Sequence, residues 1–308
     1  MSLDELLSHP LVVVTGKGGT GKSTVAAALG LAAARRGRRT IVAEVARRDD
    51  VSRALAGASG GRAFVERTLA DGLAHISIDP QSAMDEYLDD QLPGPLAELL
   101  SGSRVFGLLA AATPGMRELL TVGKVWELAQ AQRRTRGGEP YDLVVLDAPA
   151  TGHGVAVLTA PRTFAEAARV GPVARQGRTI HEMLADPART AVVAVARAEE
   201  MPVNETLALR EALGREMGLP LARAVVNGVL PARFSAADAT RVAEGLAPSS
   251  HARRAALAGA ARSRAQRAQV ARLRRGLGAV PVQTLPHLFV PEVGAAELER
   301  LSKELERR

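Results

Sequence analysis

Gly16-Lys17-Gly18-Gly19-Thr20-Gly21-Lys22-Ser23-Thr24 is the stretch that decides the fold of this 308-residue chain. It directly follows an apolar, β-branched run at residues 11–14 and precedes an alanine-rich segment at residues 25–29, which favours a helix. Its glycine and Gly-Lys-Ser spacing matches a phosphate-binding P-loop, and the flanking segments supply the strand and helix that such a loop requires. We therefore expect backbone amides and the start of the new helix to hold phosphate groups here.

The individual residues of this loop predict an ATP site that uses Mg²⁺. Lys22 is expected to neutralise the β- and γ-phosphates during catalysis, and the Ser23 hydroxyl is expected to hold the metal ion. The other loop residues are expected to contact the nucleotide mainly through their backbone: Gly16, Gly18, Gly19, Thr20, Gly21 and Thr24.

A second nucleotide motif follows the apolar run at residues 143–146, which ends in Asp147. Open α/β sheets bind ligands at the carboxyl ends of their strands, so Asp147 is predicted to hold Mg²⁺ through a water or by supporting Ser23. Pro149, Gly152 and Gly154 predict a loop after this strand that can change its path. Such a loop suits a switch that senses the γ-phosphate.

Strand-like and helical segments alternate along the chain, which predicts an α/β fold with a doubly wound, mostly parallel sheet. The strand-like segments are continuously apolar, as expected for strands covered on both faces. They lie at residues 11–14, 40–45, 75–78, 143–146, 191–196, 224–226 and 280–285.

We expect a single domain over residues 1–308, with a helical insertion at about residues 81–135 plus 155–187. The first part of the insertion contains no convincing strand and is interrupted at Pro93-Gly94-Pro95 and at Pro114-Gly115. Its apolar side chains either form the core of the insertion or offer a surface to an apolar client helix. They are Leu96, Leu99, Leu100, Val105, Phe106, Leu108 and Leu109.

Composition limits the other classes of function. No apolar run is long enough for a membrane span, and the start of the sequence lacks the basic residues of a signal peptide, so we expect a cytoplasmic protein. The chain contains no cysteine, which excludes thiolate metal sites and disulfides. The net charge of +7 raises nucleic acid as a partner, but the arginines concentrate on an alanine-rich helix at residues 251–275 and aromatic residues make up only 3%. A solvated arginine face is the favoured interpretation, and nucleic acid is not expected as a partner.

Lys17, directly after the first glycine, is typical of the deviant Walker A motif. With Asp147-Ala148-Pro149-Ala150-Thr151-Gly152-His153 and the order of the other segments, it makes the chain resemble the ArsA-like family of arsenite-pump and tail-anchored-protein-targeting ATPases. The resemblance implies a dimer in which the catalytic Lys17 reaches the nucleotide of the partner subunit. It further implies a switch that contains Pro149, Gly152 and His153.

The same resemblance assigns three later segments. Glu199 lies in the segment whose acidic residue approaches the partner subunit. Asn227 corresponds to the residue that reads adenine, for which a carboxamide that both donates and accepts is suited. The loop Pro291, Glu292 and Val293 corresponds to the one that closes over the base.

Two departures from the family pattern concern catalysis and metals. The first switch of the family reads Asp-Pro-Ala-His, whereas this chain has Glu44-Val45-Ala46-Arg47, so Glu44 is the candidate catalytic carboxylate and carries one extra methylene. Without cysteine, neither the thiolate site for arsenite nor a Cys-x-x-Cys zinc clamp can form. No ligand spacing that substitutes for them is found among His75, His153, His181, His251 and His287.

The leading hypothesis is a dimeric MgATP-dependent switch ATPase that couples its nucleotide state to binding or release of an unknown client protein or helix. Its partner is a second copy or a paralogous ATPase. One alternative is a ParA/MinD-type positioning ATPase on DNA or on membrane, the latter through peripheral contact of a helix at residues 298–305, whose flanking glutamates anionic lipid repels. Another is a nucleotide-locked subunit without turnover that pairs with an active paralogue.

Overall fold

The computed structural model describes residues 1–45, 48–57, 63–91, 115–135, 137–168 and 170–307. The apolar residues of the predicted insertion between Leu96 and Leu109 lie outside these ranges. So do the predicted interruption at Pro93-Gly94-Pro95 and the first residue, Pro114, of the second one. The domain boundaries predicted above stay a prediction.

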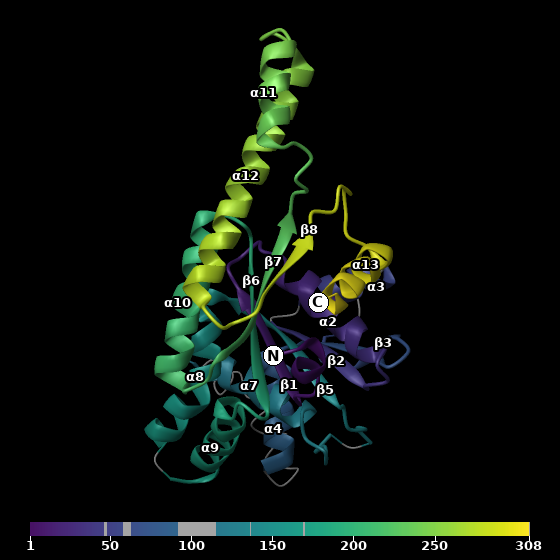
Figure 1. Ribbon diagram of the computed structural model, residues 1–308. Coiled ribbons are helices and arrows are strands. Elements are labelled where there is room, and N and C mark those ends of the chain that lie inside the picture. Colours follow the sequence, from purple (N-terminus) through teal and green to yellow (C-terminus); the bar gives the residue numbers. More distant parts are fainter. Residues whose placement is uncertain (46–47, 58–62, 92–114, 136, 169, 308) are drawn as a thin grey trace.

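A sheet of eight strands in the order β3-β4-β2-β5-β1-β6-β7-β8 forms the centre of the described chain (Figure 1). All neighbouring strands pair in parallel except β3 and β4, so the predicted mostly parallel, doubly wound sheet is confirmed. The strands are β1 Leu11–Gly16, β2 Thr40–Val45, β3 Arg67–Ala70, β4 Leu73–Ile78, β5 Leu143–Ala150, β6 Thr190–Ala196, β7 Leu221–Val229 and β8 Val282–Pro286.

Only β3 has no counterpart among the predicted strands. It is a short antiparallel strand at the edge of the sheet, and none of its residues is buried. An edge strand that is not buried does not require a continuous apolar run. The sequence pattern that identifies the central strands is therefore absent from β3.

Helices cover both faces of the sheet because side chains of each central strand alternate between two cores. Val12 and Val14 of β1 face one core, whereas Leu11 and Val13 face the other. The first core is covered by α1 Leu3–Leu7, α2 Lys22–Ala34, α3 Asp50–Ala56 and α13 Ala295–Glu306. The second is covered by α7 Met116–Leu128, α8 Thr151–Ala168, α9 Pro172–Ala185, α10 Glu200–Met217 and α12 His251–Leu277.

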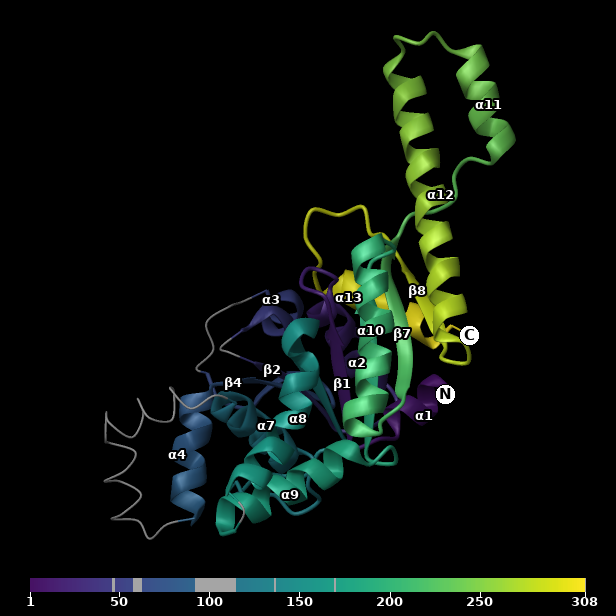
Figure 2. The ribbon, with the colours of Figure 1, turned by 90° about the vertical axis from the view of Figure 1, so that its left-hand side faces the viewer.

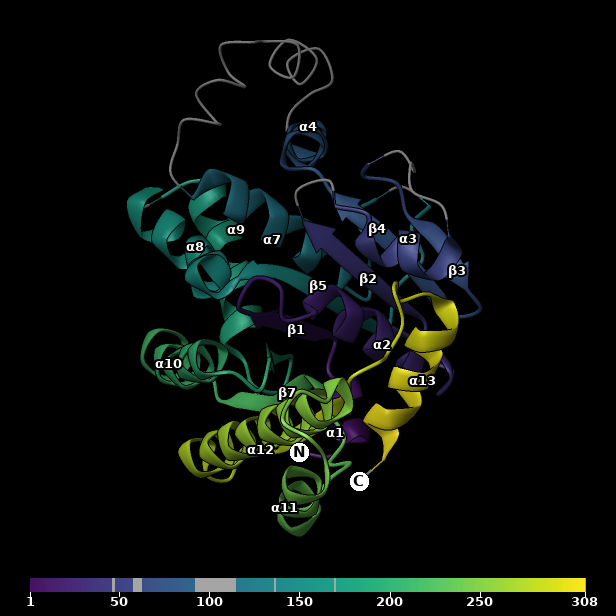
Figure 3. The same cartoon turned by 90° about the horizontal axis from the view of Figure 1, so that it is seen from above.

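The helices α4 Pro80–Gln91, α7, α8 and α9 lie together as one group, in which α7 and α8 contact β5 and α9 contacts β6 (Figures 2 and 3). α8 follows β5 without an intervening loop and packs against both α7 and α9. A change at the end of β5 therefore has a direct route into this group of helices.

The first part of α12 and the antiparallel helix α11 Ala236–Gly245 project from the body as an arm (Figures 1 and 2). α11 buries none of its residues, and most arginines of α12 are exposed. The predicted alanine- and arginine-rich helix is confirmed. Among the described helices, none combines the length and the apolar character that a membrane crossing needs.

Candidate nucleotide site

The P-loop leaves β1 through a backbone path that only glycine permits. Gly16 has a φ of 146°, and a Cβ built on it would lie 2.1 Å from the carbonyl oxygen of Val195 in β6. Gly21 has a φ of 89°, and its Cβ would lie 2.2 Å from Nδ2 of Asn227. α2 begins at the next residue without a side-chain cap, so its first amides are available to an anion.

Ser23 and Asp147 meet at the end of this loop. Parallel pairing sets Asp147 of β5 beside Val14 of β1 and Glu44 of β2, and the Ser23 hydroxyl donates a 2.6 Å hydrogen bond to its Oδ2. The carboxylate is 0% exposed, and burial raises the pKa of Asp147 to about 6, although the Ser23 hydrogen bond and the charge of Arg48 oppose the rise.

The other oxygen of Asp147, Oδ1, is buried and has no hydrogen-bond partner among the described residues. Mg²⁺ prefers oxygen ligands, and a hydroxyl, a carboxylate and an unused carboxylate oxygen lie here together. The residues present therefore fit the metal ion that the sequence predicts.

Lys22 supplies positive charge to the same site. It is only 6% exposed, and its ammonium donates to the carbonyl oxygen of Lys17 at 3.3 Å. Burial lowers the pKa of Lys22, and the nearby charge of Asp147 opposes this shift. No ion pair of Lys22 occurs in the described ranges, so an anionic ligand is the natural partner of this buried cation.

Arg48 is a site residue that sequence reasoning missed. Its Nη2 donates to Ser23 Oγ at 2.9 Å and forms an ion pair with Asp147 Oδ2. The sequence shows Arg48 directly after the altered first switch. It does not show that Arg48 contacts Asp147, because that contact depends on the paths of β2 and β5.

A pocket of about 420 Å³ opens beside the P-loop, between α3 and the loop that leads into α13. Its size is within the range of small-molecule sites. Of the predicted base-closing residues, Glu292 and Val293 line this pocket, whereas Pro291 and Asn227 do not. Asn227 instead donates its side-chain amide to the Thr20 carbonyl at 3.0 Å, which fixes the P-loop from β7.

Lys17 forms an ion pair with Glu205 of α10 in its own chain. The two side chains are 33% and 31% exposed, so Lys17 lies near the surface. Glu199, the predicted interface residue, precedes α10 and lies 3.7 Å from Arg197 Nε. Glu205, rather than Glu199, is the carboxylate that faces Lys17 within the chain.

Glu44 is buried and turned toward the start of α3. Its two carboxylate oxygens accept hydrogen bonds from the amides of Asp50 and Val51 at 3.2 and 3.0 Å, and one lies 2.9 Å from His75 Nε2. Asp49 completes a group in which the three side chains place one ligand atom each within 4.8 Å of one another. Because Glu44 already accepts two amides, we interpret this group as the anchor of α3.

The switch segment after Asp147 differs from the sequence prediction. β5 continues through Pro149, whose carbonyl accepts from Thr15 Oγ1 at 3.4 Å, and α8 begins at Thr151. Gly152, His153 and Gly154 therefore lie in the first turn of a helix, so the predicted loop over these residues is wrong. β5 runs directly into α8, and this tertiary arrangement places Gly152 and Gly154 in a helix although glycine locally favours a loop.

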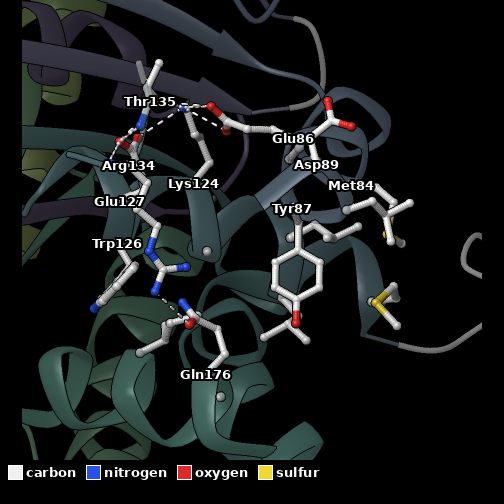
Figure 4. Close-up of a pocket in the computed structure, with 18 residues that line it drawn as sticks. Met84, Glu86, Tyr87, Asp89, Lys124, Trp126, Glu127, Arg134, Thr135 and Gln176 are labelled. Atoms are coloured by element: carbon white, nitrogen blue, oxygen red, sulfur yellow. Dashed lines mark hydrogen bonds and ion pairs between the residues drawn. The ribbon is translucent and has the colours of Figure 1, made fainter. Parts of the chain in front are cut away.

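A second, larger pocket of about 770 Å³ lies among α4, α7 and α9 (Figure 4). Met84, Leu119 and Ile180 contribute apolar surface, while Lys124 bonds Glu86 along one wall. Arg134 reaches Gln176 at 3.3 Å across the other side.

A P-loop at the amino end of a helix, with a buried aspartate beside it on a parallel sheet, defines the class of P-loop nucleotide-binding proteins. Sequence comparison identifies the family within that class. The profile of the anion-transporting ATPases matches residues 9–171 and 165–307, and the chain belongs to this family. The predicted ArsA-like ATPase membership is confirmed, and it supports a nucleotide-dependent ATPase.

Three relatives illustrate the range of similarity. ATPase BagA of Mycobacterium tuberculosis is 34% identical over 244 residues, which cover 76% of this chain and 69% of that protein. The arsenical pump-driving ATPase of Acidiphilium multivorum is 29% identical over 95% of this chain and 48% of its own length. An arsenical pump-driving ATPase of Escherichia coli is 28% identical over 95% of this chain and 48% of its own length. The chain thus spans about half the length of these two pump ATPases.

Proposed function

We propose that this protein is a MgATP-dependent switch ATPase that acts as a dimer and couples its nucleotide state to a client. The observation that carries the proposal is the pair Ser23 and Asp147, joined at 2.6 Å beside the buried Lys22 at the start of α2. A hydroxyl, a carboxylate and an ammonium at a helix amino terminus are the groups that a metal-bound triphosphate requires.

Each residue has a distinct role in this proposal. The amides at the start of α2 and the Lys22 ammonium bind the phosphates, and Ser23 and Asp147 hold Mg²⁺. The bound metal supplies charge that stabilises the phosphoryl oxygens during transfer. Glu292 and Val293, which line the pocket opposite the P-loop, cover the nucleoside end.

Dimer formation accounts for the position of Lys17. A lysine that is one-third exposed and held by a single carboxylate can exchange that partner for a phosphate on another subunit. Assembly then completes the charge at the reacting phosphate and makes turnover depend on the dimer. The partner subunit is a second copy or a paralogous ATPase.

The role of Glu44 is tied to α3. Its carboxylate binds the first amides of α3, which also contributes Asp50 and Val51 to the nucleotide pocket. We propose that Glu44 acts as a positioning residue of the first switch in this conformation. Activation of the attacking water by Glu44 requires release of these amides, so turnover is slow relative to nucleotide binding.

The client is proposed to bind at the helical layer. Asp147 lies near the end of β5, α8 follows β5 directly, and α8 packs against α7 and α9, two of the helices around the larger pocket (Figure 4). The apolar side chains of that pocket suit an apolar segment of a client protein. A change at the metal site thus reaches the pocket through one continuous strand and helix.

The proposal is tested by titrating ATP with and without Mg²⁺ in a calorimeter. Lys22→Ala is expected to weaken binding by at least about 100-fold, because a charge-assisted contact in a desolvated site is lost. Lys303→Ala, which removes an exposed lysine of α13, is the matched control and keeps the wild-type affinity. Wild-type protein that does not bind ATP overturns the proposal.

The dimer is tested by measuring steady-state hydrolysis over a range of protein concentrations, with Lys17→Ala beside the wild type. Turnover per subunit that rises with concentration and is lost in Lys17→Ala supports a homodimer. Tight ATP binding without turnover, which a paralogous ATPase restores, supports the heterodimer. Turnover that is independent of both concentration and Lys17 contradicts the proposed assembly.

A further inference from the structure

Arg48 occupies the place between Ser23 and Asp147 where a divalent cation would bind. Its Nη2 lies 2.9 Å from Ser23 Oγ and forms an ion pair with Asp147 Oδ2, and these are the two side chains that fit Mg²⁺. The guanidinium comes from the segment just after β2, the element that carries Glu44. A single positively charged group therefore contacts both of the predicted metal ligands.

The surroundings of this ion pair allow Arg48 to leave it. Arg48 is 38% exposed, whereas Asp147 is fully buried, so the arginine can leave toward solvent while the carboxylate cannot. The Nε of Arg48 has no hydrogen-bond partner within the described residues, although an ion pair of 3.6 Å joins it to Asp50 Oδ2 at the start of α3. Arg48 also lines the nucleotide pocket, so it has space to move into.

Energetics give a reason for a resident cation. A buried carboxylate without a counter-charge destabilises the folded chain, and Asp147 has Arg48 as its only ion-pair partner in the described structure. A divalent ion bound to the same two groups has to displace the guanidinium first. The cost of that displacement lowers the apparent affinity for the metal ion.

We propose that Arg48 is a tethered cation that occupies the metal site and competes with Mg²⁺ for Ser23 and Asp147. The inference rests on the proposed metal site. It makes loading of the metal depend on movement of the first switch, since Arg48 must withdraw before Ser23 and Asp147 are free. Once withdrawn, its positive charge remains beside the nucleotide pocket.

The test uses Mn²⁺, which is detected directly by loss of the electron paramagnetic resonance signal of the free ion. Mn²⁺ is titrated into the full-length protein without nucleotide and, separately, with saturating ADP. Arg48→Gln is expected to tighten Mn²⁺ binding by about tenfold in both, because one charge-assisted contact no longer has to be broken. Arg48→Lys carries a point charge that makes fewer contacts, so its affinity for Mn²⁺ is expected to lie between that of the wild type and that of Arg48→Gln.

Arg53→Gln is the matched comparison, because Arg53 lines the same pocket but bonds Asp50 and does not contact Ser23 or Asp147. It reports the effect of removing a positive charge near the site, and its shift is expected to be clearly smaller than that of Arg48→Gln. Equal shifts in the two variants overturn direct competition. Unchanged or weaker Mn²⁺ binding in Arg48→Gln overturns it as well.

Thermal unfolding without metal gives a second readout that does not depend on activity. Arg48→Gln is expected to unfold at a lower temperature than the wild type and to be stabilised more by added Mn²⁺. Asp147→Asn in the same background is expected to recover the stability and to abolish the Mn²⁺ response. If the wild type binds Mn²⁺ but no ATP, the proposed ATPase function is refuted, and the competition between Arg48 and the metal ion is still decided by Arg48→Gln. If Asp147→Asn binds Mn²⁺ as well as the wild type does, the metal site is refuted and this inference with it.

Discussion

The nucleotide site and a group of side chains around Arg133 are both buried and charged, but they differ in how completely their charges are paired. In the Arg133 cluster, which comprises Glu66, Lys124, Glu127, Arg133 and Tyr141, the arginine side chain is 0% exposed and bonds Glu66 at 2.6 Å and Glu127 at 3.0 Å. Lys124 bonds Glu127 at 3.0 Å, and the Tyr141 hydroxyl donates to Glu66.

In the nucleotide site, by contrast, Arg48 is partly exposed, and among the residues that the structure describes Asp147 has an unused buried oxygen and Lys22 donates only to a carbonyl. A buried polar network that is fully satisfied makes a fold rigid, whereas one that is partly satisfied costs free energy until a ligand completes it. The comparison teaches that the pairing of charges, more than their burial, separates a structural cluster from a binding site.

The largest expected effect breaks the complete cluster. Arg133→Met leaves the carboxylates of Glu66 and Glu127 without their main partner and is expected to lower the free energy of unfolding by about 3–5 kcal/mol. Urea denaturation measures it. Arg254→Met, at an exposed position on α12, is the control and is expected to stay within about 0.5 kcal/mol of the wild type. A loss below about 1 kcal/mol for Arg133→Met would mean that the cluster is not a structural element.

The second prediction applies the same measurement at low pH. Burial alone would raise the pKa of Glu127, but the hydrogen bond from Arg133 and the charges of Lys124 and Arg133 outweigh it and lower the pKa to about 2. This stabilisation is fully present above the ordinary pKa of 4.5 and is lost as the pH falls toward 2.

Between pH 7 and pH 3 the contribution of Glu127 is expected to fall on the order of 2 kcal/mol. The difference in unfolding free energy between wild type and Glu127→Gln should shrink accordingly. A difference that is the same at both pH values argues against a lowered pKa of Glu127.

The third prediction concerns stability at the incomplete site. Lys22→Met keeps an unbranched side chain that is one atom shorter and removes a buried cation that forms no ion pair in the described structure. The nucleotide-free variant is therefore expected to be more stable than the wild type by about 0.5–2 kcal/mol, while ATP binding is lost. If Lys22→Met is destabilised as strongly as Arg133→Met, the two sites do not differ in the way proposed.

The smallest expected effect is at the surface pair of Lys17 and Glu205. Glu205→Gln releases Lys17 and is expected to change the free energy of unfolding by less than about 1 kcal/mol, because both groups are partly exposed. ATP turnover of the dimer is expected to rise by about two- to fivefold, because Lys17 no longer has to break its ion pair with Glu205 before it reaches the partner's nucleotide. Glu211→Gln, which removes an exposed carboxylate farther along α10, serves as the control. Slower turnover in Glu205→Gln would instead assign Glu205 a supporting role.

Periodicity predicted most of the fold because the central strands are buried on both faces and are therefore apolar throughout. It missed β3, a partly exposed edge strand, and the glycines after Asp147 wrongly predicted a loop at Gly152, where α8 begins. Local glycine content was a poor guide there, since the end of β5 and the packing of α8 determine the path. Motif spacing predicted Lys22, Ser23 and Asp147, and the structure brings the last two together at 2.6 Å.

The sequence by itself determined the P-loop, the parallel sheet and the family, because the spacing of glycine, lysine and serine and the length of apolar runs are local properties. Only the tertiary structure decided that Arg48 lies on Asp147, that Lys17 faces Glu205, and that Glu44 holds the start of α3. These partners come from different strands and helices. Which charges neutralise each other depends on the order of the strands in the sheet, and no local pattern contains that order.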